Sequence, residues 1–350
     1  MRKNSDLTAL ISRLIGDWIQ RYLPVQKARS DKTIEAYEYA LALFLEFLES
    51  EKVIDGLKIV PDSFCNNNIE AWLLWLVEIR GCCAGTCNNR VAAIRAFLKY
   101  VARQNKSLAY LFHEAALVPQ RKTYRKPVEG VSKKAMAAIL SIPNQKTRTG
   151  RRDLALFSTM YNTAVRLDEI LSLRIKDLKT EGSLPTITVL GKGSKLRTLM
   201  LMPKTVRHLQ RYIRKFHGTS PKLNSYVFYS RNTGPAGKMS QVAVNKQLKN
   251  YARQAHESCP EVPVTMHAHQ IRHGRASHWL EDGLNIVQIS RLLGHSQIET
   301  TMGYLDVTNE LKAAALAKIE DDSVSKMPKK WKQDMNLASL CGIKPIKRKG

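Results

Sequence analysis

The chain has 350 residues, 44% of them hydrophobic, and its 56 Lys and Arg against 30 Asp and Glu give a formal net charge of +26. This length allows two domains with a core in each, and because the longest apolar runs, such as residues 72–77, are too short to cross a bilayer, a membrane-spanning protein is not expected. Asp6, Arg13 and Asp17 interrupt any early apolar run, which argues against a signal peptide and predicts a cytoplasmic protein.

The positive charge is concentrated beyond the first third of the chain. Residues 1–120 carry 15 Lys and Arg against 13 Asp and Glu, residues 121–320 carry 33 against 14, and residues 321–350 carry 8 against 3. A domain with such an excess repels itself unless a polyanion binds it. Nucleic acid is the expected partner, and the alternatives are an acidic membrane surface or a charged surface that only serves solubility.

The six cysteines predict neither disulfides nor a zinc site. So few in a chain of this length do not form a disulfide framework and are typical of reduced thiols. Cys82, Cys83 and Cys87 lack the paired CxxC spacing of structural zinc, so we interpret them as packing residues.

Residues 1–117 are predicted to form a helical domain. Ser30 and Asp31 stand where an N-cap is expected, ahead of apolar positions at helical spacing that continue to Leu48. Further helices are predicted over about 68–79 and 88–103. The last of these carries polar residues that either contact DNA or are ordinary solvated groups: Asn89, Arg90, Arg95 and Lys99.

Residues 118–130 contain Pro, Gly and several basic residues without periodicity, so they are predicted to be a linker, with Lys122 and Arg125 as candidate DNA contacts. A second domain is predicted over 131–320. Helical spacing covers 132–142 and 150–178, and residues 186–190 and 195–202 are predicted to pair as a β-hairpin around a turn at 191–194. Helices are then expected at about 204–216, 240–255, 271–281, 285–293 and 308–320, with Lys246 as a candidate groove contact and 321–350 as a basic tail.

Six residues of the second domain have the side chains that a phosphate-transfer site needs: Arg166, Lys192, His269, Arg272, His295 and Tyr304. An arginine donates to two phosphate oxygens at once and stays charged, so the two arginines are candidates for holding a phosphodiester. The hydroxyl of Tyr304, the only tyrosine after Tyr251, can attack it. No Asp/Glu cluster for a catalytic metal accompanies them, so we predict metal-free phosphoryl transfer through a covalent phosphotyrosine.

The basic residues have separate expected roles. Lys192 lies between two glycines at the hairpin turn, where an ammonium group can protonate a departing oxygen, although a plain turn lysine is the alternative. His269 and Arg272 are three residues apart at a helix start and are expected to point to one side. His295 follows Gly294 and is expected at a helix N-terminus, which favours anions.

A metal site is the alternative for the histidines. His267, His269 and His273 have a spacing that can surround zinc, but Arg272 lies inside the run and no carboxylate or cysteine accompanies it. That set is poorly suited to a cation, so we predict no metal.

In this order the motifs resemble the tyrosine recombinases, the phage integrase family. TMYNTAVRLDEILSLRIKDL resembles the first arginine box, with Arg166 in the arginine position, Glu169 in the acidic position and Ala164 where the family usually has glycine. VLGKGSKLRTLML resembles the hairpin with the catalytic lysine, HQIRHGRASHWLEDG the His-x-x-Arg box, and LLGHSQIETTMGYL the final box with the nucleophile. KTIEAYEYALALFLEFL and TCNNRVAAIRAFLKYV are similar to the helical core-binding domain.

The resemblance implies a mainly α fold with a small β-hairpin or sheet, of the α+β class, in which a SAM-like core-binding domain and an integrase catalytic domain clamp double-stranded DNA. It implies a site-specific recombinase from a bacterial, phage or mobile-element context that needs no cofactor. The nucleophile would form a 3′-phosphotyrosine, Lys192 would be the general acid, and Glu169 would orient a neighbouring arginine or histidine. Four protomers, monomeric in solution, would exchange strands through a Holliday junction. A type IB topoisomerase-like nicking and resealing enzyme and a non-cleaving DNA-binding relative are the alternatives.

Overall fold

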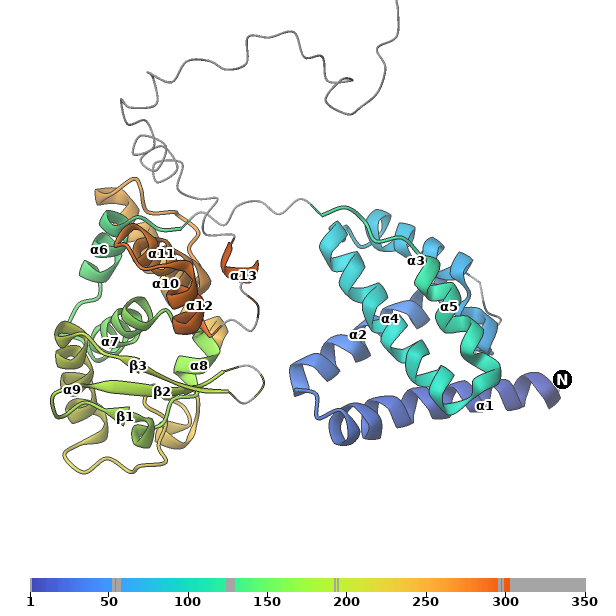
Figure 1. Ribbon diagram of the computed structural model, residues 1–350, viewed down its shortest axis with the longest axis horizontal. Coiled ribbons are helices and arrows are strands. Elements are labelled where there is room, and N and C mark those ends of the chain that lie inside the picture. Colours follow the sequence, from blue (N-terminus) through green and yellow to red (C-terminus); the bar gives the residue numbers. More distant parts are fainter. Residues whose placement is uncertain are drawn as a thin grey trace, which may run out of the picture. The chain divides into compact units, whose positions relative to one another are not determined.

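The computed structural model describes residues 2–51, 54, 58–123, 130–191, 193, 195–294, 297 and 299–302. The chain divides into two compact units, Met1–Arg125 and Lys126–Gly350 (Figure 1). Several predicted features lie outside the described residues: Arg125, Lys192, His295, Tyr304, the helix expected at 308–320 and the basic tail.

The N-terminal unit is helical. Its helices are α1 (Arg2–Asp17), which continues as a π-helix (Trp18–Gln26), α2 (Asp31–Ser50), α3 (Asn66–Glu78), α4 (Ala84–Gln104) and α5 (Ala109–Leu117), with 3₁₀ turns at Pro61–Phe64 and Lys106–Leu108. Ser30 is the N-cap of α2, as the sequence predicts, with extended backbone at φ −67° and ψ 149°. The π-helix was not predicted; it contains Pro24, which has no backbone N–H to donate to a regular helical turn.

An aromatic core holds these helices together. The ring of Phe44 on α2 lies 5.1 Å from that of Trp72 on α3, edge to face, and the ring of Trp18 lies 5.3 Å from that of Phe97 on α4. All four side chains are fully buried. Each contributes about 1.5–3 kcal/mol through burial, so the unit has a core of its own.

The first part of the predicted linker packs on this unit. Val118 is buried in its core, and the side chain of Asn88 on α4 donates to the carbonyl of Arg121 (2.9 Å) and accepts from its N–H (3.0 Å).

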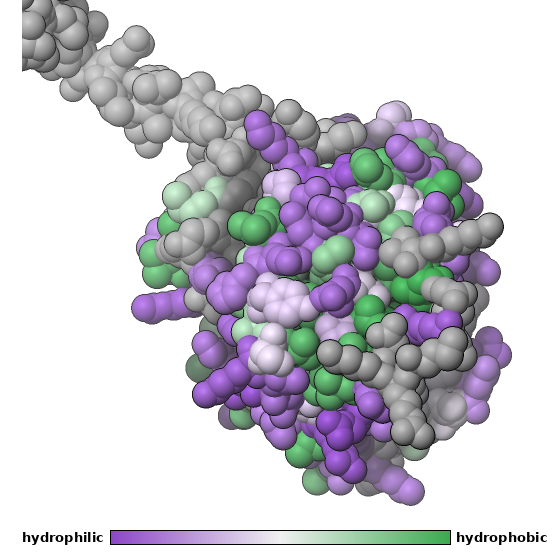
Figure 2. All heavy atoms as spheres, turned by 90° about the vertical axis from the view of Figure 1, so that its right-hand side faces the viewer, coloured by the Kyte–Doolittle hydropathy of each residue, from purple (hydrophilic) through white to green (hydrophobic). Residues whose placement is uncertain are grey.

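On the face of the molecule drawn in Figure 2, hydrophilic side chains predominate and hydrophobic ones form small separate patches. No helix of the part that the structure describes is both long and apolar enough to cross a membrane.

The C-terminal unit combines helices with a small sheet. Its elements are α6 (Lys133–Ser141), α7 (Arg148–Thr163), α8 (Leu167–Leu171), β1 (Leu178–Lys179), β2 (Thr186–Leu190), β3 (Leu196–Met200), α9 (Pro203–His217), α10 (Gln241–Ser258), α11 (Ala268–Glu281), α12 (Ile286–Leu293) and α13 (Glu299–Met302), with 3₁₀ turns at Ile175–Asp177 and Gly234–Ala236. α11 packs against α7 and α12, and α8 contacts β2 (Figure 1). A mainly helical fold with a small sheet is therefore confirmed.

The sheet is antiparallel in the order β1–β2–β3. Ile187 pairs with Leu199 across the hairpin and with Leu178 on β1, and both Ile187 and Leu199 face the core. The hairpin confirms the prediction for residues 186–202. β1 begins at the last residue of the stretch predicted to be helical. Just before it, Asp177 accepts a hydrogen bond from the backbone N–H of Arg174 at a 3₁₀ turn, after which the chain extends.

The helix predicted over 150–178 is also wrong in its middle, because α7 ends at Thr163. Ala164 adopts the left-handed conformation at φ 50° and ψ 28° and caps α7. Arg166 is then extended and becomes the N-cap of the short helix α8. A left-handed alanine costs about 1–2 kcal/mol, and the surrounding packing has to offset it. The break matters because it places Arg166 at a helix start instead of within a helix.

Gly294 lies at the end of the helix predicted over 285–293. It adopts φ 65° and ψ 44° and caps the C-terminus of α12, whereas His295 lies outside the described residues. Glycine is favoured at this cap because it has no Cβ to strain the left-handed conformation. The helix N-terminal field that was expected to favour a phosphate at His295 is therefore not supplied by α12.

Candidate active site

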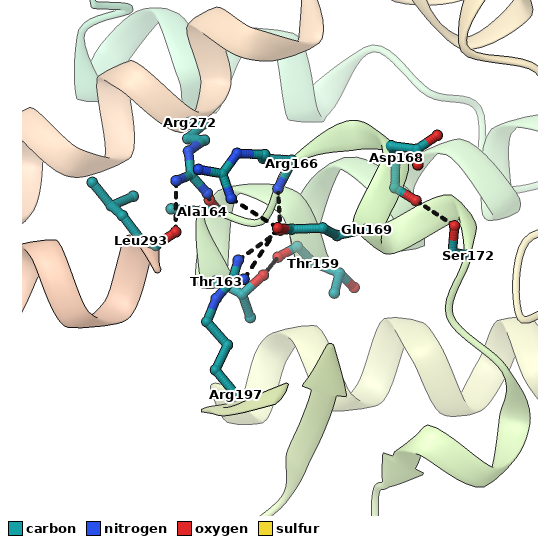
Figure 3. Close-up of polar contacts among 10 residues, drawn as sticks. All are labelled: Thr159, Thr163, Ala164, Arg166, Asp168, Glu169, Ser172, Arg197, Arg272 and Leu293. Atoms are coloured by element: carbon teal, nitrogen blue, oxygen red, sulfur yellow. Dashed lines mark hydrogen bonds and ion pairs between the residues drawn. The ribbon is translucent and has the colours of Figure 1, made fainter. Parts of the chain in front are cut away.

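Of the six residues predicted to act on a phosphate, Arg166, His269 and Arg272 lie in the described part of the chain. Figure 3 shows Arg166 beside Arg272, one from the start of α8 and the other from the second turn of α11. The structure thus brings together two arginines that are more than a hundred residues apart in the sequence.

Arg272 is held by two backbone carbonyls. Its side chain is only 1% exposed, and its guanidinium group donates from Nη1 to the carbonyl of Ala164 (2.6 Å) and from Nη2 to the carbonyl of Leu293 (2.7 Å). These acceptors are the cap of α7 and the last residue of α12. A buried guanidinium group with fixed partners is preorganised, and it also ties the ends of two helices to α11.

Arg166 is fixed by Glu169, one turn further along the chain. The carboxylate accepts a bond from the backbone N–H of Arg166 at Oε2 (2.8 Å) and one from its Nη1 at Oε1 (2.9 Å). The side chain of Arg166 is 34% exposed, whereas that of Glu169 is only 6% exposed. The arrangement orients the guanidinium group and leaves part of it accessible to a ligand.

A second arginine, Arg197 on β3, binds the same carboxylate. Its Nη1 donates to Oε1 of Glu169 (3.1 Å) and its Nη2 to Oε2 (2.6 Å), a two-pronged pair in which the side chain of Arg197 is 12% exposed. Burial alone would raise the pKa of Glu169, but hydrogen bonds from Arg197 and Arg166 outweigh it and hold that pKa below its usual value. Glu169 is therefore ionised at neutral pH.

The sequence reasoning did not single out Arg197, although a signal was present. Strand residues two apart face the same side, so Arg197 shares a side with Leu199, which is buried. An arginine at an inward-facing strand position requires a buried acceptor, and the acidic residue of the first arginine box is the natural candidate.

His269 lies beside a second histidine on α11. It lies in the first turn of α11, and its ring is edge-on to that of His273 with 4.4 Å between centroids. The residue is exposed, but the protein packed around the imidazole lowers its pKa, and the guanidinium groups of Arg272 and Arg166 lower it further. The described residues hold no cluster of three or more His, Cys, Asp or Glu side chains that could bind a metal ion.

The predicted DNA contacts divide into exposed and engaged side chains. Arg90 lies over the ring of Tyr39 at 5.0 Å, and Arg95 donates to the carbonyl of Ala115 (2.8 Å) and to that of Val118, which anchors the end of α5. Arg95 thus has a structural task. The remaining described candidates are exposed: Asn89, Lys99, Lys122 and Lys246.

Both units match known sequence families. Residues 129–310 match the Phage integrase family, and residues 18–105 match the Phage integrase, N-terminal SAM-like domain. Among curated relatives, tyrosine recombinase XerC of Xanthomonas axonopodis pv. citri is 30% identical over 306 residues, covering 86% of this chain and 93% of the relative. Tyrosine recombinase XerD of Listeria innocua is 27% identical over 302 residues, covering 84% and 94%.

Solved structures share the fold. XerH site-specific recombinase in a post-cleavage complex with palindromic difH substrate has a TM-score of 0.63 at 19% identity, covering 82% of this chain and 80% of that one. The Tn1549 transposon integrase in complex with transposon right end DNA has a TM-score of 0.62 at 18% identity, covering 86% and 98%. A lambda integrase tetramer bound to a Holliday junction has a TM-score of 0.58 at 14% identity, covering 83% and 76%.

Proposed function

We propose that this chain, which belongs to the phage integrase family and is a tyrosine recombinase similar to XerC and XerD, cuts and rejoins DNA through a 3′-phosphotyrosine at Tyr304. The tyrosine hydroxyl attacks a phosphodiester, the bond to the 5′ oxygen breaks, and that oxygen leaves as a hydroxyl after taking a proton. Because the phosphotyrosine stores the bond energy, a 5′ hydroxyl of another strand can reverse the step.

The observation that carries the proposal is the pair of preorganised arginines. Attack on a phosphodiester concentrates charge on the two non-bridging oxygens, and donors that are already in place stabilise it without reorganisation. Arg166 is set by Glu169, and Arg272 is set by the carbonyls of Ala164 and Leu293. We assign both arginines to the phosphate.

Proton transfer is divided between the remaining residues. A lowered pKa leaves His269 neutral, which suits acceptance of the tyrosine proton. Lys192 would give a proton to the leaving 5′ oxygen, and His295 would contact the phosphate; both roles rest on the sequence motifs, because these residues lie outside the described part. Guanidinium groups supply the charge, so the proposed chemistry uses no metal.

We further propose that four protomers exchange strands in pairs through a Holliday junction, in the integration, excision or resolution of a mobile element or replicon. The lambda integrase tetramer on a Holliday junction, which shares the fold, supports this assembly. The positive charge of the C-terminal unit supports binding to DNA. The exposed groups proposed to contact the DNA are Lys246 in that unit and, in the N-terminal unit, Asn89, Lys99 and Lys122.

The test begins with a duplex that the chain binds, selected by mobility shift from a randomised pool. A nick placed close to the cleavage position lets the short leaving strand diffuse away and traps the covalent complex on a denaturing gel. Wild type should form the adduct, and Tyr304→Phe should form none while binding the duplex within about threefold of wild type.

Three other results would contradict the proposal in different ways. An adduct that persists in Tyr304→Phe removes the nucleophile. Binding without any adduct in wild type identifies a non-cleaving relative. Relaxation of supercoiled plasmids that lack the selected site, without strand exchange, identifies a topoisomerase-like enzyme.

A further inference from the structure

We propose that Arg197 is a positioning residue that holds Gly191 and Gly294, the residues before Lys192 and His295, against the Arg166–Glu169 pair. This inference rests on the proposed cleavage reaction. In this proposal Arg197 does not touch the DNA. Instead, it fixes the positions of Gly191 and Gly294.

The first step is the anchor. Two parallel hydrogen bonds join the guanidinium group of Arg197 to the carboxylate of Glu169, and Arg166 binds the same carboxylate (Figure 3). Such a two-pronged geometry restricts both rotation and translation of the guanidinium group. Since both partners are nearly buried, little solvent competes for these bonds, and β3 is tied firmly to α8.

The second step is the contact with the hairpin turn. A Cβ atom built on Gly191 would lie 3.0 Å from Nη1 of Arg197, which is closer than ordinary packing allows. The guanidinium group therefore lies directly against the backbone of Gly191, the residue before Lys192. The N–H of Gly191 also donates to the carbonyl of Lys195 (2.8 Å), which closes the base of the turn. Arg197 thus fixes the position of Gly191, the last described residue before Lys192.

The third step is the same contact with the end of α12. A Cβ atom on Gly294 would lie 3.0 Å from Nη1 of Arg197, 3.1 Å from its Cδ and 3.2 Å from its Cζ. Gly294 precedes His295, and its left-handed conformation turns the chain at this point. The glycines of two separate motifs thus both give room to the side chain of Arg197, and at Gly294 the left-handed backbone favours glycine as well.

Charge strengthens the argument. Glu169 alone beside Arg166 would cancel the positive charge that a phosphate needs, whereas the second arginine leaves the trio with a net positive charge. Arg197 therefore lets Glu169 orient Arg166 without neutralising the site.

The experiment measures single-turnover cleavage of two nicked duplexes, one with the ordinary 5′-bridging oxygen and one with a 5′-bridging sulfur, which leaves without needing a proton. Arg197→Gln should slow cleavage of the oxygen duplex by about 100-fold, the lower end of what general acid catalysis contributes. The sulfur duplex should recover at least about tenfold, and Lys192→Ala, measured alongside, should show the same recovery. Arg207→Gln, on the exposed side of α9, is the matched control and should cleave both duplexes at the wild-type rate.

A purely structural role would slow both duplexes equally, and that result overturns the inference, as does cleavage of the oxygen duplex within threefold of wild type. Should Arg197→Gln not fold, Gly191→Ala is the second test, because Gly191 is not left-handed and its added methyl group would displace Nη1 of Arg197 while keeping all charges. It should show the same preference for the sulfur duplex, and an unchanged ratio of the two rates overturns the inference. Absence of any adduct in wild type would instead contradict the proposed function.

Discussion

Replacing Ala164 by glycine should cost the protein almost no stability, although a buried methyl group is lost. Ala164 is fully buried among Ala276, Trp279, Ile289 and Leu293. Losing its methyl group costs about 0.8 kcal/mol. The greater freedom of glycine in the unfolded chain costs about 0.4–1 kcal/mol more. Relief of the left-handed conformation at φ 50° returns about 1–2 kcal/mol, so the sum is close to zero.

Ala276 provides the matched control. It is fully buried in the same cluster but lies inside α11 with helical backbone, so Ala276→Gly has the same losses and no strain to relieve. Its expected cost is about 2 kcal/mol, from the methyl group and from glycine in a helix interior. The two substitutions should therefore differ by about 1–2 kcal/mol.

Urea unfolding of the full chain, followed by circular dichroism, measures this difference directly, since both residues lie in one cluster of the same unit. Equal destabilisation by the two glycines would refute the reasoning, because Ala164 would then carry no strain. A loss larger at Ala164 than at Ala276 would refute it as well.

Three further outcomes follow from the site. The pKa of Glu169 is lowered in the folded state, so its ionised form contributes stability that is fully present above the ordinary pKa of about 4.3 and is lost as the pH falls through the lowered pKa. Glu169→Gln should therefore remove part of the acid sensitivity of thermal unfolding. An unchanged pH profile would contradict the ion-pair network. The pKa of His269 is also lowered, so its imidazole should stay neutral below a pH of about 6.5, and the cleavage rate should fall only in more acidic buffer. His269→Gln should lose this fall of the rate in acid. A fall that begins above a pH of about 7 would contradict the assignment. EDTA should leave the cleavage rate unchanged, since guanidinium groups are proposed to supply the phosphate charge, and a metal-dependent recovery would return the histidines to a cation site.

The sequence allowed the fold class and much of the local structure to be predicted. Ser30 signalled the start of α2, and alternation around Ile187 and Leu199 signalled the hairpin, because in both cases the information is local. The break at Ala164 was not predicted, since alanine favours helix and only the packing around it imposes the left-handed turn. The helix predicted over 285–293 is present as α12, which Gly294 caps.

The candidate site was predictable as a set of residue types, not as a network. Motif order pointed to Arg166, His269 and Arg272, and the fold brings the two arginines together. The link from Glu169 to Arg197 joins residues 28 positions apart in sequence, and it depends on how α8 meets β3. No local sequence pattern predicts this contact between α8 and β3. Physical pairing rules, applied to an arginine at an inward-facing strand position, are what reveal it.

The central claim is the covalent bond between Tyr304 and DNA, and one measurement tests it most directly. The trapped adduct is digested with nuclease and trypsin, and the modified peptide is sequenced by mass spectrometry. The account predicts a nucleotide joined through its 3′ phosphate to the oxygen of Tyr304. A nucleotide attached to any other residue, or joined through its 5′ phosphate, would contradict it.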